Sequence, residues 1–421
     1  MYLSRPPRRQ ASPRRVLIYL ALIGAGLLLL RFQDDLRRPV TPTPTPTRAS
    51  QSYVAEAEAH YEAGRLHAAI DAYIQAAALE PNRVDVLVTL SRLLALADRT
   101  EEAIQRAQRA VQIDPKSALA HAVLAMAYDW HGTRLLLHGR DAEATQHYEK
   151  AVSEAQEAIL IDPAYPEAHA YLAEAYMDLG QLVDAIEAAQ AAVEINPDRP
   201  DVQRAVGYVR ESQGNYLGAA EAYRQAIRFD PNVPYLWLTL GRNYRILSIL
   251  VDGGYFDDAL AAFGRAIQID PTYAPAYDEL GWTYYNAQDY RQAAETLEEA
   301  IQVDPDSWSA YNHLGITYYS NRNYEGAAET LPRAIELMNE TFDADRYCVN
   351  ATSRACDRLV EAYYTLGLAN YYLCGCETSL SLFDKALALR PEEPNALEGI
   401  RLCREETSPT CPEAETATPT P

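Results

Sequence analysis

A short motif, in which an apolar residue is followed two positions later by proline, returns along most of this chain at a nearly fixed spacing. The prolines are Pro81, Pro115, Pro163, Pro197, Pro231, Pro271, Pro305 and Pro391. The intervals between them are 34, 48, 34, 34, 40, 34 and 86 residues. The last interval equals 34 plus 52, and Asn339 stands where the missing proline would lie. Such a period predicts stacked copies of one small unit, and nine units account for the pattern.

Each unit carries the residue pattern of two amphipathic helices. The first helix has a large apolar residue directly before a small one, as in Leu280-Gly281, and tyrosine often follows three positions later, as Tyr284 does. The second helix has two alanines seven positions apart, as in Ala293 and Ala300. Small residues let paired helices approach closely, and proline ends each second helix. The sequence therefore predicts an all-α protein built from repeated helix pairs.

The 34-residue period, the Leu-Gly-x-x-Tyr pattern, the alanine pair and the terminal proline together resemble the tetratricopeptide repeat. The resemblance covers about residues 53–393, and residues 394–406 have the pattern of a final capping helix. It implies an α-solenoid, a right-handed superhelix of nine helix pairs whose first helices line a concave groove. Because each repeat contacts mainly its neighbours, we expect one elongated domain over residues 51–406. Proteins of this family usually bind peptides or protein partners.

Three stretches interrupt the period. Extra residues near 132–145 and 248–253 fall between the two helices of the third and sixth units, and residues 342–359 separate the eighth unit from the ninth. Insertions on one edge of a solenoid can mark a binding surface. The alternative for the first insertion is that residues 141–159 extend the second helix by a few turns.

The repeat register predicts which side chains line the groove. In the sixth to ninth units they are mostly aromatic residues, arginine or asparagine: Tyr235, Arg242, Arg245, Trp282, Tyr285, Asn286, Asn312, Tyr319, Tyr364, Tyr371 and Tyr372. In the first five units the same positions are more acidic: Glu58, Asp85, Asp129, Glu167, Glu174, Asp178, Asp201 and Glu211. Aromatic side chains offer apolar area with a polar group, and arginine binds carboxylates. We therefore expect the C-terminal half of the groove to bind a peptide, unless its tyrosines only pack between helices.

The N-terminal 50 residues differ from the rest. Residues 1–15 are basic, and residues 16–30 form an uncharged apolar run bounded by Arg15 and Arg31. We interpret residues 16–32 as a transmembrane signal-anchor with a cytoplasmic N-terminus, followed by a Thr/Pro-rich linker over 33–50. A cleaved signal peptide or a buried core helix are the alternatives. The C-terminal residues 407–421 have a similar Thr/Pro-rich composition and are expected to be disordered.

The overall charge and the motifs exclude several functions. The chain has a net charge of −22, which argues against nucleic acid as a partner because phosphate binding needs a basic surface. No metalloprotease, phosphate-loop, dinucleotide-binding or nucleophile-elbow motif is present. His131, His138, Asp141 and His147 lie near the first insertion, but ordinary surface histidines explain them better than a metal site. The sequence therefore predicts a protein that is not an enzyme and has no cofactor.

All six cysteines follow residue 347. They are Cys348, Cys356, Cys374, Cys376, Cys403 and Cys411. An even, clustered set favours disulfides outside the cytoplasm. We expect Cys348 to pair with Cys356, and either Cys374 or Cys376 to pair with Cys403. A metal site is the alternative, but the spacing lacks paired C-x-x-C motifs. The two sequons at Asn339 and Asn350 leave glycosylation open.

These features predict a membrane-tethered, extracytoplasmic scaffold that binds protein or peptide segments in its groove. The alternatives are a structural envelope component that assembles by self-association into a homo-oligomer, or a non-catalytic accessory subunit of an envelope complex.

Overall fold

The computed structural model describes residues 12–31, 48–251, 254–341 and 354–405. Within these residues the chain forms twenty α-helices and no strands. The chain divides into two units, Met1–Arg48 and Ala49–Pro421, which are treated separately below. Several predictions fall wholly or partly outside the described residues: the basic tail, the linker, the C-terminal tail, most of the third insertion, and residues Cys348, Asn350 and Cys411.

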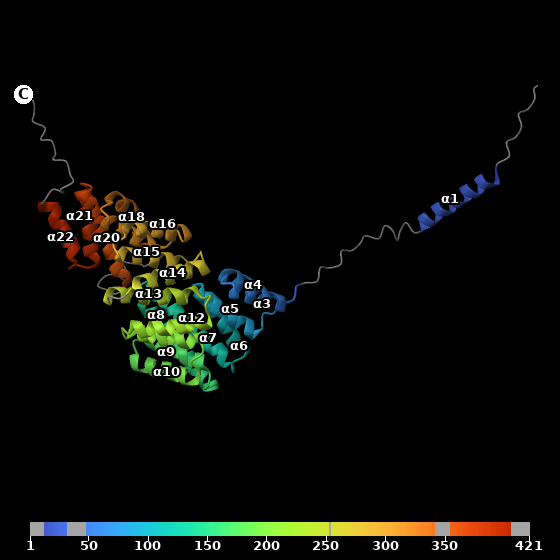
Figure 1. Ribbon diagram of the computed structural model, residues 1–421, viewed down its shortest axis with the longest axis horizontal. Coiled ribbons are helices and arrows are strands. Elements are labelled where there is room, and N and C mark those ends of the chain that lie inside the picture. The colour runs from blue at the N-terminus through green and yellow to red at the C-terminus, as the bar shows by residue number, and fades with distance from the viewer. Residues whose placement is uncertain (1–11, 32–47, 252–253, 342–353, 406–421) are drawn as a thin grey trace, which may run out of the picture. The chain divides into compact units, whose positions relative to one another are not determined.

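The second unit consists of nine consecutive helix pairs and a last single helix (Figure 1). The pairs are α3 (Ser50–Glu62) with α4 (Leu66–Leu79), α5 (Val84–Leu96) with α6 (Thr100–Ile113), α7 (Ala118–Leu137) with α8 (Asp141–Ile161), α9 (Pro166–Asp178) with α10 (Leu182–Ile195), α11 (Pro200–Ser212) with α12 (Tyr216–Phe229), α13 (Pro234–Leu250) with α14 (Tyr255–Ile269), α15 (Ala274–Asn286) with α16 (Tyr290–Val303), α17 (Trp308–Ser320) with α18 (Tyr324–Thr341), and α20 (Arg354–Tyr372) with α21 (Cys376–Leu389); α22 (Pro394–Glu405) follows. This order confirms the predicted helical solenoid.

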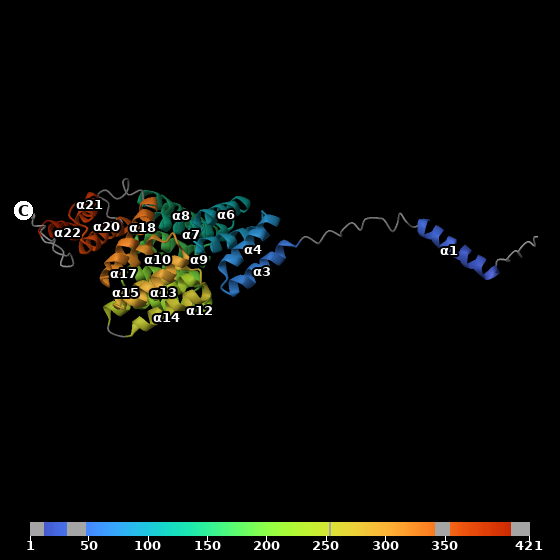
Figure 2. The same cartoon turned by 90° about the horizontal axis from the view of Figure 1, so that it is seen from above.

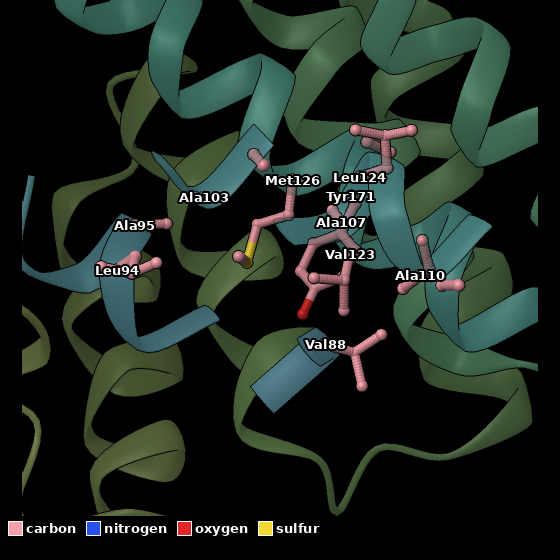
Figure 3. Packing of buried hydrophobic residues seen from close by; sticks show 14 of the residues in the cluster. Val88, Leu94, Ala95, Ala103, Ala107, Ala110, Val123, Leu124, Met126 and Tyr171 are labelled. Carbon is pink, nitrogen blue, oxygen red and sulfur yellow. The ribbon is translucent and has the colours of Figure 1, made fainter. Parts of the chain in front are cut away.

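The small residues of the repeat sit where two helices of a pair touch. A Cβ atom placed on Gly241 would lie 2.6 Å from the ring of Phe263, and one on Gly315 would lie 2.4 Å from Leu331. The repeated alanines of the second helices, such as Ala293 and Ala300, are wholly buried, and Figure 3 shows Ala103, Ala107 and Ala110 of α6 in the packed interior with side chains of α5 and α7. Close approach therefore requires these residue types, because a larger side chain has no space.

The turn inside each pair uses a left-handed backbone conformation at a repeated position. Gly180 and Gly214 are 34 residues apart and have φ angles of 73° and 74°. Asp98, Gln288 and Arg322 occupy the equivalent position with φ near 60°, at a steric cost that glycine avoids. The left-handed turn therefore recurs along the chain with the same period as the sequence motif.

The first insertion lengthens both helices of the third pair. Helix α7 has 20 residues and α8 has 21, whereas α9 and α10 have 13 and 14. The 14 extra residues therefore add about two turns to each helix. The alternative in which the second helix is extended is correct, and the first helix grows with it. In the sixth pair α13 grows to 17 residues in the same way.

The superhelix brings repeats that are distant in sequence into contact. Asn232, just before α13, donates a hydrogen bond of 2.6 Å from its side-chain nitrogen to the carbonyl of Glu62, 170 residues earlier. Tyr61 and Leu96 pack against the apolar cluster that includes Val233 and Leu236. Both views show the blue N-terminal repeats beside the yellow-green helices α12 to α14 (Figure 1, Figure 2). The first and sixth repeats therefore touch, although a solenoid is built mainly from contacts between neighbours.

The first unit contains α1 (Pro13–Arg31), which includes the segment predicted to span a membrane. Among the described helices none is both long enough and apolar enough to cross a bilayer. Helix α1 has 19 residues, but arginines at both ends leave only the 15 uncharged residues 16–30 between them. That run is about 22 Å long, and a bilayer core is about 30 Å thick. The predicted transmembrane helix over 16–32 is therefore not supported.

A disulfide holds the C-terminal end of the solenoid. Cys376, the first residue of α21, is bonded to Cys403 on α22, with 5.6 Å between their Cα atoms. This confirms one of the two predicted pairings, and it fixes the capping helix to the last repeat. Cys356 and Cys374 are also disulfide-bonded, and the described part of the chain contains no free cysteine.

Candidate functional site

In the first six repeats, the inner face of the first helices is closed by its own side chains. The Nη2 atom of Arg92 lies 2.6 Å from Oδ2 of Asp201, and the Tyr61 hydroxyl donates a 2.5 Å hydrogen bond to Asp230. The rings of Trp130 and Tyr235 have centroids 5.1 Å apart. Each contact joins repeats that are not neighbours. The expected open groove is therefore absent from this part of the described chain.

The centre of this closed interior is a buried ion-pair cluster. Arg204 has a side chain only 7% exposed, and its Nη2 lies 3.0 Å from Glu174 and 3.5 Å from Asp201. Its guanidinium group also lies 5.0 Å from the ring centroid of Trp130. Glu174 and Asp201, which were predicted to line an acidic groove, therefore form ion pairs with an arginine inside the protein. Removing one partner would leave a buried charge uncompensated, which is strongly destabilising.

Burial also changes the protonation of the acidic residues beside this cluster. Loss of solvation raises the pKa of Asp178 to about 6 and that of Glu174 to about 7, although Tyr208 and Arg204 respectively oppose the shift. The pKa of Asp129 lies well above its ordinary value, first because it is buried and then because Asp178 is close. The side chain of Asp129 is only 3% exposed. These carboxyl groups belong to a low-dielectric interior and are not a solvated binding surface.

A small cavity lies where the first repeat meets the sixth. Tyr61, Leu96, Tyr235 and Tyr273 line a cavity of about 10 Å³. That volume holds roughly one water molecule. A peptide cannot enter the structure at this place without separating the first repeat from the sixth.

Three of the predicted groove residues take part in these internal contacts. Tyr235 packs on Trp130, Arg242 Nε lies 2.7 Å from Glu279 Oε1, and Arg245 Nη2 lies 2.9 Å from Glu279 Oε2. Burial would raise the pKa of Glu279, but the two guanidinium groups outweigh it and lower the pKa. The arginines expected to bind a partner's carboxylate therefore already bind Glu279, which the sequence did not single out.

Beyond the closed interior, α15, α17 and α20 bring together an aromatic cluster. The ring of Trp282 stacks on Tyr285, with centroids 4.3 Å apart, and on His313, with centroids 4.2 Å apart. Arg358 from α20 lies 5.9 Å from the Trp282 centroid. Asp278 accepts hydrogen bonds from His313 Nδ1 at 2.7 Å and from a neighbouring serine, so His313 is held in place. His313 and Arg358 were missed from the sequence because they lie outside the groove positions of the register.

A second group of rings lies on α17, α18 and α20. Tyr324 and Tyr372 are stacked with centroids 4.4 Å apart, and Tyr319 lies 5.8 Å from Tyr324 and 6.5 Å from Tyr372. Tyr371 is only 2% exposed and packs in the core, whereas Tyr319 and Tyr372 are half-buried. Tyr324 begins a second helix, where the register gave no reason to expect a groove residue.

The remaining predicted residues differ in exposure. Tyr364 is half-buried on α20, and loss of solvation raises its pKa to about 12. Asn286 is exposed at the end of α15. Asn312 is wholly buried, and both of its side-chain amide atoms are without a hydrogen-bond partner among the described residues. We name the half-buried set Trp282, Tyr285, His313, Tyr319, Tyr364 and Tyr372 the aromatic face.

The described residues contain no group of three or more histidine, cysteine or acidic side chains that could hold a metal ion. His131 and His147 approach with ring centroids 4.6 Å apart, but His131 Nδ1 is 2.9 Å from the hydroxyl of Thr100. Burial lowers the pKa of His147 to about 4. These histidines pack the base of the elongated third pair.

Comparison with known proteins supports the repeat assignment. Two tetratricopeptide repeat models match, one over residues 60–127 and 139–207 and the other over residues 196–234 and 279–339. Together they cover just over half of the 421 residues. A comparison with curated proteins finds no match.

Several solved structures share the fold at low sequence identity. The Cut9–Hcn1 complex of the APC/C matches with a TM-score of 0.58 at 15% identity, covering 81% of this chain but 59% of that one. A monomeric IFIT1 variant with m7Gppp-AAAA matches with a TM-score of 0.57 at 16% identity, covering 90% and 86%. The human IFIT1 dimer matches with a TM-score of 0.50 at 14% identity, covering 86% and 84%. This chain thus spans less than two thirds of the Cut9 chain.

Proposed function

We propose that this chain, which belongs to the tetratricopeptide repeat family, binds a segment of a partner protein on its aromatic face. Proteins built from these repeats generally mediate protein–protein interactions and are typically non-catalytic. The observation that carries the proposal is the difference between the two halves of the inner face. The first six repeats fill it with their own side chains, whereas the aromatic face on α15, α17 and α20 keeps six half-buried rings.

The chemistry of the aromatic face indicates which segments would fit. Its charged groups are compensated internally, since Asp278 pairs with His313 and Arg358 lies 2.7 Å from Glu361. The ring of Trp282 is already stacked on Tyr285 and on His313. Ring edges, the Tyr285 hydroxyl and the amide of Asn286 are what a partner would meet. We therefore expect an uncharged, partly apolar segment and not a strongly acidic or basic one.

Site-specific photocrosslinking tests this proposal. A photoreactive phenylalanine analogue at Asn286, which is exposed beside Tyr285, should give a covalent adduct with the partner in cells. The same analogue at Glu299, exposed on the second helix of that repeat, is the matched control. Tyr285→Ala combined with Tyr319→Ala should abolish the adduct at position 286 while far-UV circular dichroism stays unchanged. An adduct that forms only at position 299, or that survives both substitutions, would contradict the proposal.

We also propose that residues 51–406 lie outside the cytoplasm. The support is the Cys376–Cys403 bond and the disulfide-bonded state of Cys356 and Cys374, since such bonds persist in oxidising compartments. Rapid acid quenching of cells, followed by alkylation with a mass-tagged maleimide, counts the free thiols. We expect no tag on these four cysteines without prior reduction. Full tagging without reduction would place the domain in a reducing compartment.

A further inference from the structure

A cleft lies between α12, α13 and α14, away from the residues of the aromatic face. Its volume is about 450 Å³, and it has no part in the aromatic face. Clefts of roughly 300–1,000 Å³ are the size that holds small organic ligands. Nothing in the proposed function uses this cleft.

One face of α13 lines the cleft. Trp237, Leu240 and Tyr244 line it and lie three and four residues apart, which puts them on one face of the helix. Arg242 and Arg245, which bind Glu279, lie on the opposite face at about 100° per residue. The same helix therefore separates the internal ion pairs from the outer cleft.

The floor of the cleft is apolar and its walls are aromatic. Leu240 and Ala262 are each 3% exposed and Ile227 is 7% exposed, so the floor is part of the packed core. Trp237 and Tyr244 are half-buried. The indole N–H of Trp237 donates a 2.9 Å hydrogen bond to the carbonyl of Pro231, which fixes the ring. This surface can hold an aliphatic or aromatic group without rearrangement.

Two arginines stand above this floor. Arg224 and Arg228 are one turn apart on α12, both are exposed, and neither forms an ion pair with a carboxylate of the described residues. Some exposed arginines of this acidic chain are paired, as Arg291 is with Glu295 at 3.0 Å, so the two arginines of the cleft keep their charge available to a ligand. Two adjacent guanidinium groups can hold one carboxylate by charge-assisted hydrogen bonds.

Arginine occurs at the repeat position of Arg224 in no other repeat of this chain. In the second and third repeats the equivalent residues are Gln108 and Gln156, which donate hydrogen bonds of 2.8 and 3.0 Å to the hydroxyls of Tyr128 and Tyr176. The other repeats have Ile74, Gln190, Gly264, Glu298, Pro332 and Asp384 there, so Arg224 is the one cation. Every other repeat has a neutral or acidic residue at this position, whereas here a positive charge lies beside Tyr244 and lines the cleft.

The opposite end of the cleft is negative. Glu221 lies one turn before Arg224 on α12, and Asp258 lies in the first turn of α14. Arg228 lies one turn beyond Arg224, so along α12 the charge changes from negative at Glu221 to positive at the two arginines. A ligand with two negative charges is disfavoured by these acids, whereas a ligand with a carboxylate at one end and an amine at the other matches both ends.

We propose that this cleft binds a zwitterionic apolar ligand of about dipeptide size. Its side chains would pack on Trp237, Leu240 and Tyr244, its carboxylate would bind Arg224 and Arg228, and its amino group would face Glu221 and Asp258. The site is independent of the aromatic face, because it lies on α12, α13 and α14, whereas the aromatic face lies on α15, α17 and α20.

Calorimetric titration of the full chain with the dipeptide leucyl-phenylalanine tests this site. We expect binding in the millimolar range or tighter, and a loss on the order of tenfold when the carboxylate is replaced by an amide, because the charge-assisted hydrogen bonds to the two arginines are then lost. The double variant Arg224→Gln/Arg228→Gln should bind the dipeptide more weakly by a similar factor. Both side chains are exposed, so the fold should be kept, and circular dichroism checks this.

Arg265→Gln removes an exposed arginine of α14 that does not line the cleft, and it should leave the titration unchanged. No heat or ligand-observed NMR signal at millimolar dipeptide would overturn the proposal. Equal binding of the dipeptide and its amide, or an Arg224/Arg228 double variant that binds as well as the parent, would overturn it too.

Discussion

Arg92 on α5 and Asp201 on α11 form an ion pair although 109 residues separate them, and their closest atoms are 2.6 Å apart. The two helices belong to the second and fifth repeats, which are not neighbours. Burial would raise the pKa of Asp201, but Arg92 and Arg204 outweigh it and lower the pKa. This pair is one of the contacts that turn an open spiral of helix pairs into a closed interior.

The coupling between Arg92 and Asp201 can be measured directly. A double-mutant cycle with Arg92→Gln and Asp201→Asn should give a coupling free energy of about 1 kcal/mol, discounted because the Arg92 side chain is 39% exposed. Urea unfolding supplies the free energies. The exposed pair Arg291–Glu295 on α16 is the control and should couple by about 0.3–0.5 kcal/mol. If the Arg92–Asp201 coupling is zero within error, the ion pair does not stabilise closure.

Replacing either of two glycines in the sixth repeat by alanine should change the stability of the protein, but in opposite directions. Gly241→Ala places a methyl group 2.6 Å from the ring of Phe263 and should destabilise the chain by about 1–3 kcal/mol. Gly264→Ala meets no atom within 4 Å on α14 and should stabilise by about 0.5–1 kcal/mol through helix propensity. Thermal unfolding ranks the two variants against the parent. Equal effects of both substitutions would show that the packing of Gly241 is looser than described.

The buried carboxyl of Asp178 should make stability fall as pH rises. Its folded pKa is raised from 3.8 to about 6 by burial, so its contribution is fully present below pH 3.8 and is lost as pH rises through about 6. Asp178→Asn cannot ionise and accepts from Tyr208 as before. Between pH 4 and pH 7, the free energy of unfolding of Asp178→Asn should rise relative to that of the parent by on the order of 1–3 kcal/mol.

Urea unfolding at several pH values measures that difference. Asp306→Asn removes a carboxyl that is 82% exposed and is the control for losing one negative charge. A parent-to-Asp178→Asn difference that stays constant from pH 4 to pH 7 would mean that Asp178 is solvated in the folded protein.

The disulfide between Cys376 and Cys403 should stabilise only the end of the solenoid. It closes a loop with a sequence separation of 27 residues, for which about 2–4 kcal/mol is typical. In the Cys376→Ser/Cys403→Ser variant, amide hydrogen exchange should accelerate in α21 and α22. Helices α9 to α12 should keep their protection, because each repeat depends mainly on its neighbours. Unchanged exchange in α22 would show that packing alone holds the capping helix.

Much of the fold could be predicted from the sequence because it is local. The 34-residue period, the buried alanines and the small residue at Gly241 or Gly315 each reflect contacts inside one helix pair, where side chains a few residues apart decide the packing. The pairing of Cys403 with Cys376 or Cys374 followed from the same neighbour logic. The membrane-spanning prediction is not supported, because the uncharged run of α1 is shorter than a bilayer core.

Which inner residues face solvent could not be predicted in this way. The register placed Tyr235, Arg242 and Asp201 on a concave surface, but it contained no information on what would lie opposite them. Glu279 comes from the next repeat, whereas Trp130 and Arg92 come from distant repeats, and their approach depends on the small rotation between successive pairs, added over several repeats.

The sequence by itself therefore determined nine helix pairs, their order, their register and a stapled C-terminal end. Only the tertiary structure decided that the first six repeats close on themselves and that the aromatic face begins beyond them. The physical reason is one of scale: helix pairing is fixed by contacts within 34 residues, whereas closure depends on an accumulated superhelical turn that joins residues more than 100 positions apart.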